Sequence, residues 1–391
     1  MTKIPDHRLT RVRLRNYRSI RSCDVELGAL TCLVGPNGSG KSSFLDALQL
    51  VGQGLRGDLV GAIGERGGVG QLLSRGAPDD ALIEIVLDGR CPGERFRYEV
   101  HLAPTEDGSY RIDREWCGVW PDDWLEEDGP AAEFRSDHVS EHELTAEPSR
   151  RLYLPSAVGF SEFSPYSQVL ELLGRFETFS INPDVVRAPQ RQLPGDRLLR
   201  DGANLALVLR ELERTEGGRS VIGRVVDYLS LIVPDLVGLR RLQAGPWETL
   251  EFLVRQEGDG GGHWTFPALS VSDGTLRAAG VLLALFGSGQ PAPLGIEEPE
   301  NALNPAASGI LLDALRDAAE QRQVIITTHS PDLVDSDLLG PAELRAVRRV
   351  DGATVIDQVD DAARLALTEH LFTAGELLRV DQLQPRSGGA G

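Results

Sequence analysis

A glycine-rich segment near the amino terminus carries the residues with the clearest chemistry. Residues 35–42 read Gly-Pro-Asn-Gly-Ser-Gly-Lys-Ser and follow an apolar run that ends at Val34. In the pattern G-x-x-x-x-G-K-[ST] between a strand and a helix, backbone N–H groups surround a phosphate, the lysine reaches the outer phosphates and the hydroxyl binds Mg²⁺. The segment predicts a cradle for a nucleoside triphosphate. The residues expected to contact the nucleotide are Asn37, Gly38, Ser39, Gly40, Lys41, Ser42 and Ser43.

Two adjacent carboxylates lie far downstream, in the segment Leu294-Gly-Ile-Glu297-Glu298-Pro. Adjacent residues of a strand point to opposite faces, so the two acids are expected to have different tasks. We expect Glu297 to lie near Mg²⁺, together with Ser42, and Glu298 to lie past the strand end and polarise an attacking water. The next apolar strand ends before His329, which can contact the outermost phosphate or hold that water.

A third segment, Leu269-Ser-Val-Ser272-Asp-Gly274-Thr, precedes an apolar helix. Ser272 can cap this helix, because its hydroxyl can accept a hydrogen bond from a free N–H group of the first turn. Gly274 lets a phosphate come close to the remaining N–H groups. The helix tip is therefore a second candidate phosphate contact.

In this order, the three segments resemble the ABC-type P-loop ATPases of the RecF/SMC/OLD group, which includes AAA_21-like predicted ATPases. Ser272-Asp-Gly274-Thr stands where transporters carry LSGGQ, and residues 297–305 resemble the EEPE…LHP run of this group. His329 stands where the group has its switch histidine. Asn16-Tyr-Arg18-Ser19 resembles the N-[FY]-[RK]-S segment, whose basic residue reaches a nucleotide phosphate.

The resemblance implies that ATP and Mg²⁺ are the cofactors, and that ATP is hydrolysed slowly to ADP and phosphate. It also implies a homodimer closed by an ATP sandwich, in which Ser272 and Gly274 of one chain complete the site of the other. A glutamine that links Mg²⁺ to the lid is expected as well. Gln71 is the candidate, and Gln49 and Gln53 stay open as alternatives.

Two departures from the group limit the function. About 230 residues separate cradle and signature segment without sustained heptads, so the long coiled coil of SMC proteins is not expected. Only 61 residues follow Ser330, too few for the TOPRIM domain of OLD nucleases and the terminal strands. Nuclease activity of this chain is therefore not expected.

The hydrophobic patterns predict an α/β fold: an ABC-ATPase head with a mixed sheet, an antiparallel β arm and a helical lid insertion. We expect the cradle part of the core in residues 1–100 and a β-rich, acidic arm in residues 101–165. A helical lid is expected in residues 166–265. The rest of the core, with the signature, the acid pair and the histidine, is expected in residues 266–391.

The charge is unevenly distributed over the 391 residues. The net charge is −19, yet residues 1–21 contain seven Lys or Arg and one Asp, whereas residues 101–150 contain four Arg and fourteen Asp or Glu. Binding of DNA by the whole surface is therefore not expected, although a local DNA contact stays open. No apolar run is long enough to span a membrane. The four cysteines have no metal-binding spacing, and we expect a cytoplasmic protein.

Two functions fit these features. The first is an ATP-gated dimeric switch that regulates a separate effector, a nuclease or toxin, in a defence-type system. The alternative is a RecF-like ATPase that clamps DNA in repair or genome maintenance. The acidic arm favours a protein partner over DNA.

Overall fold

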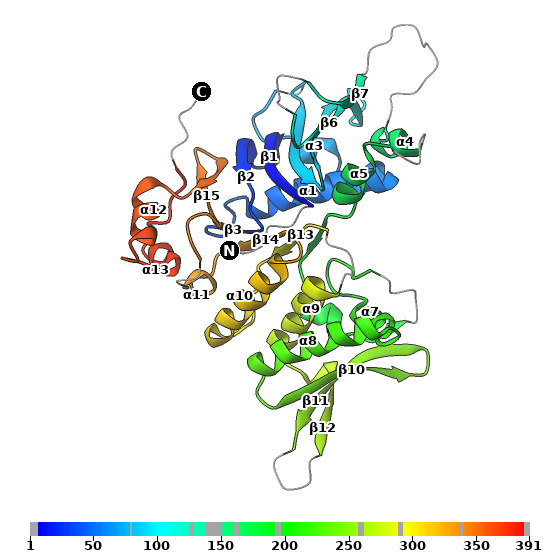
Figure 1. The fold of residues 1–391 in the computed structure, drawn as a ribbon, viewed down its shortest axis with the longest axis vertical. Coiled ribbons are helices and arrows are strands. Elements are labelled where there is room, and N and C mark those ends of the chain that lie inside the picture. Colours follow the sequence, from blue (N-terminus) through cyan, green and yellow to red (C-terminus); the bar gives the residue numbers. More distant parts are fainter. Residues whose placement is uncertain are drawn as a thin grey trace.

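The computed structural model describes the chain in nine stretches (Figure 1). These are residues 7–78, 80–124, 129–137, 150–159, 164–191, 197–256, 262–287, 292–336 and 339–386. Parts of the predicted acidic arm, residues 125–128 and 138–149, lie outside them.

A mixed six-stranded sheet forms the centre of the fold. Five strands run parallel and only the terminal β16 is antiparallel to its neighbour. β3 and β14 are buried along their whole length, as expected for apolar strands covered on both faces. In spatial order, the strands are β16 (Ala353–Gln358), β15 (Leu344–Val350), β3 (Leu30–Val34), β14 (Val324–Thr328), β13 (Leu294–Glu297) and β8 (Glu177–Phe179).

A second, antiparallel sheet of six strands forms the predicted β arm, but it begins earlier in the chain than expected. Its order is β2 (Ile20–Glu26), β1 (Arg8–Tyr17), β4 (Ile83–Cys91), β5 (Glu94–Pro104), β6 (Tyr110–Pro121) and β7 (Ala132–Asp137). Along β1, apolar residues such as Val12 and Leu14 are buried, whereas the arginines between them reach solvent. Local alternation predicts the strands but not their partners, so the extent of this sheet was missed.

The helix α1 (Lys41–Gln53) lies between the two sheets. Its apolar side chains share one buried cluster with Val12 and Ile85 of the antiparallel sheet and with Leu33 and Ile325 of the central sheet. On the other side of the central sheet, a second buried cluster joins α8 (Glu216–Ile232), α9 (Asp273–Phe286) and α10 (Pro305–Ala319), which lie together in Figure 1. The cradle helix is therefore held between the two sheets.

The insertion over residues 166–265 is only partly helical, which differs from the prediction. It contains α5 (Ser167–Gly174), α6 (Pro183–Arg187), α7 (Leu205–Glu213) and α8. However, β8 belongs to the central sheet, and three residues are too few to show a periodic pattern. A small antiparallel sheet completes the insertion and extends to Pro267: β10 (Leu236–Ala244), β11 (Trp247–Arg255) and β12 (His263–Pro267), with β9 (Gln190–Arg191) beside β11.

Short helices connect these layers. Among the described residues, no helix is both long and apolar enough to cross a membrane. The short helices are the π-helical turn Gly54–Asp58, α2 (Leu59–Glu65), α3 (Val69–Leu72), α4 (Leu154–Gly159), the 3₁₀ turn Ala268–Ser270, α11 (Pro331–Val334), α12 (Asp361–Thr368) and α13 (Ala374–Arg379).

Candidate functional site

The glycine-rich loop lies between β3 and α1, as the sequence predicts, and two of its glycines have no room for a side chain. Gly40 has a φ of 106°, and a β-carbon there would lie 2.0 Å from Oγ1 of Thr354. A β-carbon at Gly35 would lie 2.0 Å from the carbonyl oxygen of Val347. The hairpin of β15 and β16 therefore packs closely against the loop and stabilises its conformation.

Lys41 begins α1 and is buried at the base of the loop. Its Nζ donates to the carbonyl oxygens of Gly35 at 2.8 Å and Pro36 at 3.0 Å. Burial lowers the pKa of Lys41, while the charges of Glu298 and Glu300 act in the opposite direction. Of the two predicted acids, Glu298 is thus close enough to influence Lys41.

The loop fits the phosphate and the Mg²⁺ that the fold family implies. Oγ of Ser39 is buried and has no hydrogen-bond partner in the described part of the chain, so it is available to an anion. Asn37 and Gly38 form the exposed tip of the loop, and Gly38 has a φ of 74°. The Ser42 hydroxyl and the Glu297 carboxylate are hard oxygen donors of the kind that Mg²⁺ prefers.

The amino-terminal turn adds a second wall beside the loop. Oγ of Ser19 lies 3.2 Å from Oγ of Ser43, and Oγ1 of Thr354 donates to Ser19 at 2.9 Å. Arg18 has a left-handed φ of 51° and pairs with Asp46 on α1 at 3.1 Å. A non-glycine residue in this region is strained, so the fold holds Arg18 in place against a cost.

Glu297 and Glu298 lie at the same edge of the central sheet as the loop. β14 pairs in parallel with both β3 and β13, with Thr328 beside Val34 and Thr327 beside Glu297. The carboxyl ends of the three strands therefore meet, and the acids, His329 and the loop all follow from that edge. If Glu297 and Glu298 had lain far from the loop, the predicted site could not have formed.

Glu298 is held by several contacts after β13 ends. Its backbone is left-handed, with a φ of 44°, and its N–H donates to the carbonyl of Thr327 at 2.9 Å. One carboxylate oxygen lies 3.1 Å from Nδ1 of His329, and the other accepts from Nδ2 of Asn301 at 2.6 Å. The structure thus brings the predicted pair of Glu298 and His329 together and adds Asn301, which the sequence analysis missed.

Glu297 has a partner that the sequence analysis also missed. Nη2 of Arg200 lies 2.5 Å from Oε1 of Glu297. The backbone of Arg200 is fixed, because its carbonyl accepts from the N–H of Ser180 at 2.8 Å, in the loop after β8. Nothing in the sequence near Arg200 indicates this contact, which depends on the position of β8 in the sheet.

The predicted signature segment forms the exposed tip of α9. Oγ of Ser272 accepts from the N–H of Thr275 at 3.3 Å, so Ser272 caps the helix as expected. A β-carbon at Gly274 would lie 2.4 Å from the carbonyl oxygen of Ala302. This glycine is therefore required by a contact within the chain, which the sequence analysis did not foresee. One turn further, Nη1 of Arg277 donates to the backbone carbonyl of Glu298 at 3.4 Å.

A third carboxylate and a capping residue lie in the loop after Glu298. Glu300 is buried, accepts from Oγ1 of Thr328 at 2.5 Å, and has a second oxygen without a partner among the described residues. Burial raises the pKa of Glu300. Asn304 caps α10, since its Oδ1 accepts from the N–H of Ala307 at 2.9 Å. In the sequence, the short spacing from Glu298 was the feature that could have indicated Glu300 as a site residue.

The three candidate glutamines occupy different surroundings. Oε1 of Gln49 is buried and accepts from both the N–H and the hydroxyl of Thr178, at 2.8 and 3.2 Å. Oε1 of Gln53 accepts from Arg66 at 2.7 Å. Gln71 is exposed and lines a cavity. Gln49 and Gln53 thus already have partners within the fold, and Gln71 stays the candidate.

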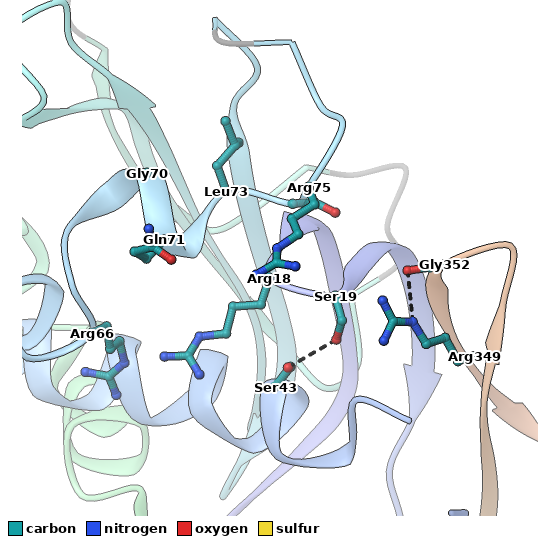
Figure 2. A pocket seen from close by; sticks show the side chains of 11 residues that line it. Arg18, Ser19, Ser43, Arg66, Gly70, Gln71, Leu73, Arg75, Arg349 and Gly352 are labelled. Atoms are coloured by element: carbon teal, nitrogen blue, oxygen red, sulfur yellow. Dashed lines mark hydrogen bonds between the residues drawn. The ribbon is translucent and has the colours of Figure 1, made fainter. Parts of the chain in front are cut away.

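That cavity has a volume of about 690 Å³ and adjoins Ser19 and Ser43 (Figure 2). Figure 2 shows Arg18, Arg66, Arg75 and Arg349 around it. The lining residues are Arg18, Ser19, Ser43, Arg66, Gly70, Gln71, Leu73, Ser74, Arg75, Arg349 and Gly352.

Comparison with known proteins identifies a family for the chain and relatives with a similar fold. Residues 30–335, more than half of the chain, match the family model described as "AAA domain, putative AbiEii toxin, Type IV TA system". A 58-residue segment is 43% identical to the DNA replication and repair protein RecF of Vibrio cholerae serotype O1, and covers 14% of this chain and 16% of that protein. A 43-residue segment is 46% identical to the OLD nuclease of Thermus scotoductus, and covers 11% of this chain and 8% of that protein. The chain thus matches only a small part of these relatives.

Among solved structures, an SMC head bound to the C-terminal winged-helix domain of ScpA covers 91% of this chain and 99% of its own, with 14% identity and a TM-score of 0.56. An SMC head with an extended coiled coil from Pyrococcus furiosus, bound to the C-terminal domain of ScpA, covers 93% and 99%, with 14% identity and a TM-score of 0.50. At 14% identity, the likeness to these two structures shows a similar fold and nothing further. The family model that matches residues 30–335 is AAA_21. The chain therefore belongs to the AAA_21 family and is an ABC-type P-loop ATPase of the RecF/SMC/OLD kind.

Proposed function

We propose that the protein is a Mg²⁺-dependent ATPase that works as an ATP-gated dimeric switch and regulates a separate effector, a nuclease or toxin, in a defence-type system. The observation that carries the proposal is the meeting of Lys41, Glu298 and His329 at one sheet edge, while the Ser272 tip stays exposed. The rate of hydrolysis is expected to be slow, because such sites use hydrolysis to time opening and closing.

Each catalytic residue has a proposed task. Lys41 exchanges the two loop carbonyls for the outer phosphates of ATP. Mg²⁺, held by Ser42, Glu297 and the Gln71 region, would neutralise part of the phosphate charge. Glu298 accepts a proton from the attacking water, and Asn301 and His329 on either side fix the direction of its carboxylate.

The proposal of a dimer rests on the Ser272 tip. Ser272 and Asp273 are exposed, and the hydrogen bonds of the Ser272 side chain go to Thr275 within the same helix. The N–H groups of the first turn of α9 suit a phosphate. In the proposed dimer, this phosphate is the outermost one of the ATP that the second chain holds.

A mixing experiment tests the composite site. Ser272→Arg and Glu298→Gln are each expected to abolish hydrolysis as pure proteins, whereas mixed dimers contain one site with both halves intact. Mixing is therefore expected to restore hydrolysis, up to about a quarter of wild-type activity when the two variants pair at random. A mixture that stays as inactive as its components would show that each chain works alone.

The choice of an effector over DNA rests on charge. On the solvent side of the antiparallel sheet, Arg11 pairs with Asp24, and both Arg13 and Arg97 pair with Asp88. These three arginines each pair with a carboxylate of the same sheet, and the whole protein is strongly acidic. A surface of this kind offers a phosphate backbone little free positive charge.

A RecF-like ATPase that clamps DNA is the second candidate, favoured by the 43% identity to RecF over 58 residues. The two are separated by measuring the affinity for duplex DNA at low and high salt with ATP bound. Affinity that is absent at low salt eliminates the clamp, whereas strong binding that weakens steeply with salt eliminates the effector reading as the main function.

A further inference from the structure

The cavity beside Ser43 is lined by arginines, and its positive charge would not be balanced by an uncharged nucleoside. Four arginines line its 690 Å³, and none of the lining residues is acidic. The carboxylate of Asp46, just behind the wall, pairs with Arg66 at 2.8 Å and with Arg18 at 3.1 Å. Two of the four guanidinium groups thus share one carboxylate, which leaves an excess of positive charge at the cavity.

Two of the four arginines have no carboxylate partner in the described part of the chain. Arg66 is buried and also donates to Gln53 and Ala62, so it belongs to the wall. Arg75 and Arg349, in contrast, are exposed, and Nε of Arg349 donates to the backbone carbonyl of Gly352 at 3.3 Å. Exposed guanidinium groups of this kind are well suited to bind phosphate.

The arginines come from separate segments that the fold ties together. The N–H of Arg18 donates to the carbonyl of Leu72, at the end of α3, at 2.6 Å, and the N–H of Ser74 donates to Asn16 at 3.0 Å. Asp351 and Gly352, both with positive φ, make the tight turn that follows Arg349. Figure 2 shows Arg18, Arg75 and Arg349 around one space. The backbone segments that carry these arginines are therefore held together by the fold.

The position of the cavity relative to the glycine-rich loop indicates which part of a bound nucleotide lies beside it. This step rests on the proposed function. Lys41 serves the outer phosphates, and Ser43, two residues further along α1, lines the cavity. In the proposed binding mode, with the outer phosphates at Lys41, the nucleoside end of ATP lies on the Ser43 side of the loop, toward the arginines. Because ribose and base carry no charge, Arg75 and Arg349 have no anion to bind in ATP itself.

We propose that the cavity binds a second phosphate group, outside the triphosphate, through Arg75 and Arg349. The group is a phosphate ester, carried either on the ribose of the bound nucleotide or by a polynucleotide strand that enters from the open side. Occupation of the cavity links recognition of this second phosphate to the nucleotide state of the cradle, because Ser19 and Ser43 border both.

The test compares three probes on the full chain: ATP, adenosine 3′-phosphate 5′-triphosphate, and a short DNA strand with saturating ATP. The double variant Arg75→Ala/Arg349→Ala is matched with Arg219→Ala/Arg255→Ala, which removes two exposed arginines from α8 and β11. We expect wild type and control to bind at least one phosphate-bearing probe. The cavity variant should lose about tenfold in that affinity per arginine, while its ATP affinity changes less than about twofold.

Each outcome decides the proposal. The probe that responds identifies the source of the phosphate. Equal loss of affinity for ATP overturns the proposal, because the arginines would then serve the triphosphate. It is also overturned if neither phosphate-bearing probe responds to the cavity variant. Failure of wild-type protein to bind ATP would instead refute the proposed function, and the ATP measurement shows this separately.

Discussion

Replacing Gly274 with alanine tests whether the tip of α9 and the catalytic loop are mechanically joined. The new β-carbon would lie 2.4 Å from the carbonyl oxygen of Ala302. Ordinary contacts of this kind are about 1 Å longer, so the loop must move by roughly that distance. Ala302 is itself left-handed, with a φ of 65°, and the N–H of Asn301 donates to Glu298 at 3.2 Å, so the loop has little freedom to move alone.

The displaced loop is expected to carry Asn301 away from Glu298. A shift of this size typically costs about 100-fold in rate, and overpacking costs about 1–3 kcal/mol of stability. We therefore expect Gly274→Ala to lower hydrolysis by one to two orders of magnitude and to lower the melting temperature. Its ATP affinity should stay close to wild type, because the loop at Gly40 and Lys41 is untouched.

The assays are phosphate release at steady state, equilibrium binding of a fluorescent ATP analogue and thermal unfolding. Gly309→Ala is the matched control, since it makes the same change in a helix where a β-carbon meets nothing within 4 Å. If Gly274→Ala hydrolyses ATP and melts like this control, the mechanical link between tip and loop does not exist.

Three further variants probe single contacts of the site. Arg200→Ala removes the cation on Glu297 and should lower the Mg²⁺ concentration needed for nucleotide binding by about fivefold, since a half-exposed pair contributes about 1 kcal/mol; an unchanged Mg²⁺ titration contradicts this role. Lys41→Ala should abolish ATP binding without unfolding the chain, and retained affinity in a calorimetric titration would mean that the cradle is misassigned. Asn301→Ala should lower kcat by about tenfold with little change in KM, because a positioning hydrogen bond to a charged group is lost; a change confined to KM would argue against positioning.

The sequence was sufficient for those parts of the site that lie in contiguous segments. The loop before Lys41, the acids at the end of β13 and the cap at Ser272 each have a local pattern with a physical cause. The order of the strands in the central sheet could not be predicted as directly from the sequence. That these segments meet depends on β14 lying between β3 and β13, which periodicity alone does not specify.

The remaining contacts could not be predicted, because they join residues far apart in the sequence. Arg200 reaches Glu297 only because β8, a strand of three residues, fixes the loop that carries Ser180. Likewise, Arg349 and Arg75 line one cavity because the hairpin of β15 and β16 and the segment after α3 both bond to the amino-terminal turn. Short buried strands and long-range side-chain contacts leave no periodic trace.

The proposed ATP sandwich is tested most directly by the mass of the Glu298→Gln variant in solution. With hydrolysis blocked, saturating Mg²⁺ and ATP should convert it to twice the mass of one chain by light scattering, with one nucleotide bound per chain. Adding Ser272→Arg to the same chain should return it to a single-chain mass. A Glu298→Gln protein that binds ATP yet stays a single chain would contradict the account.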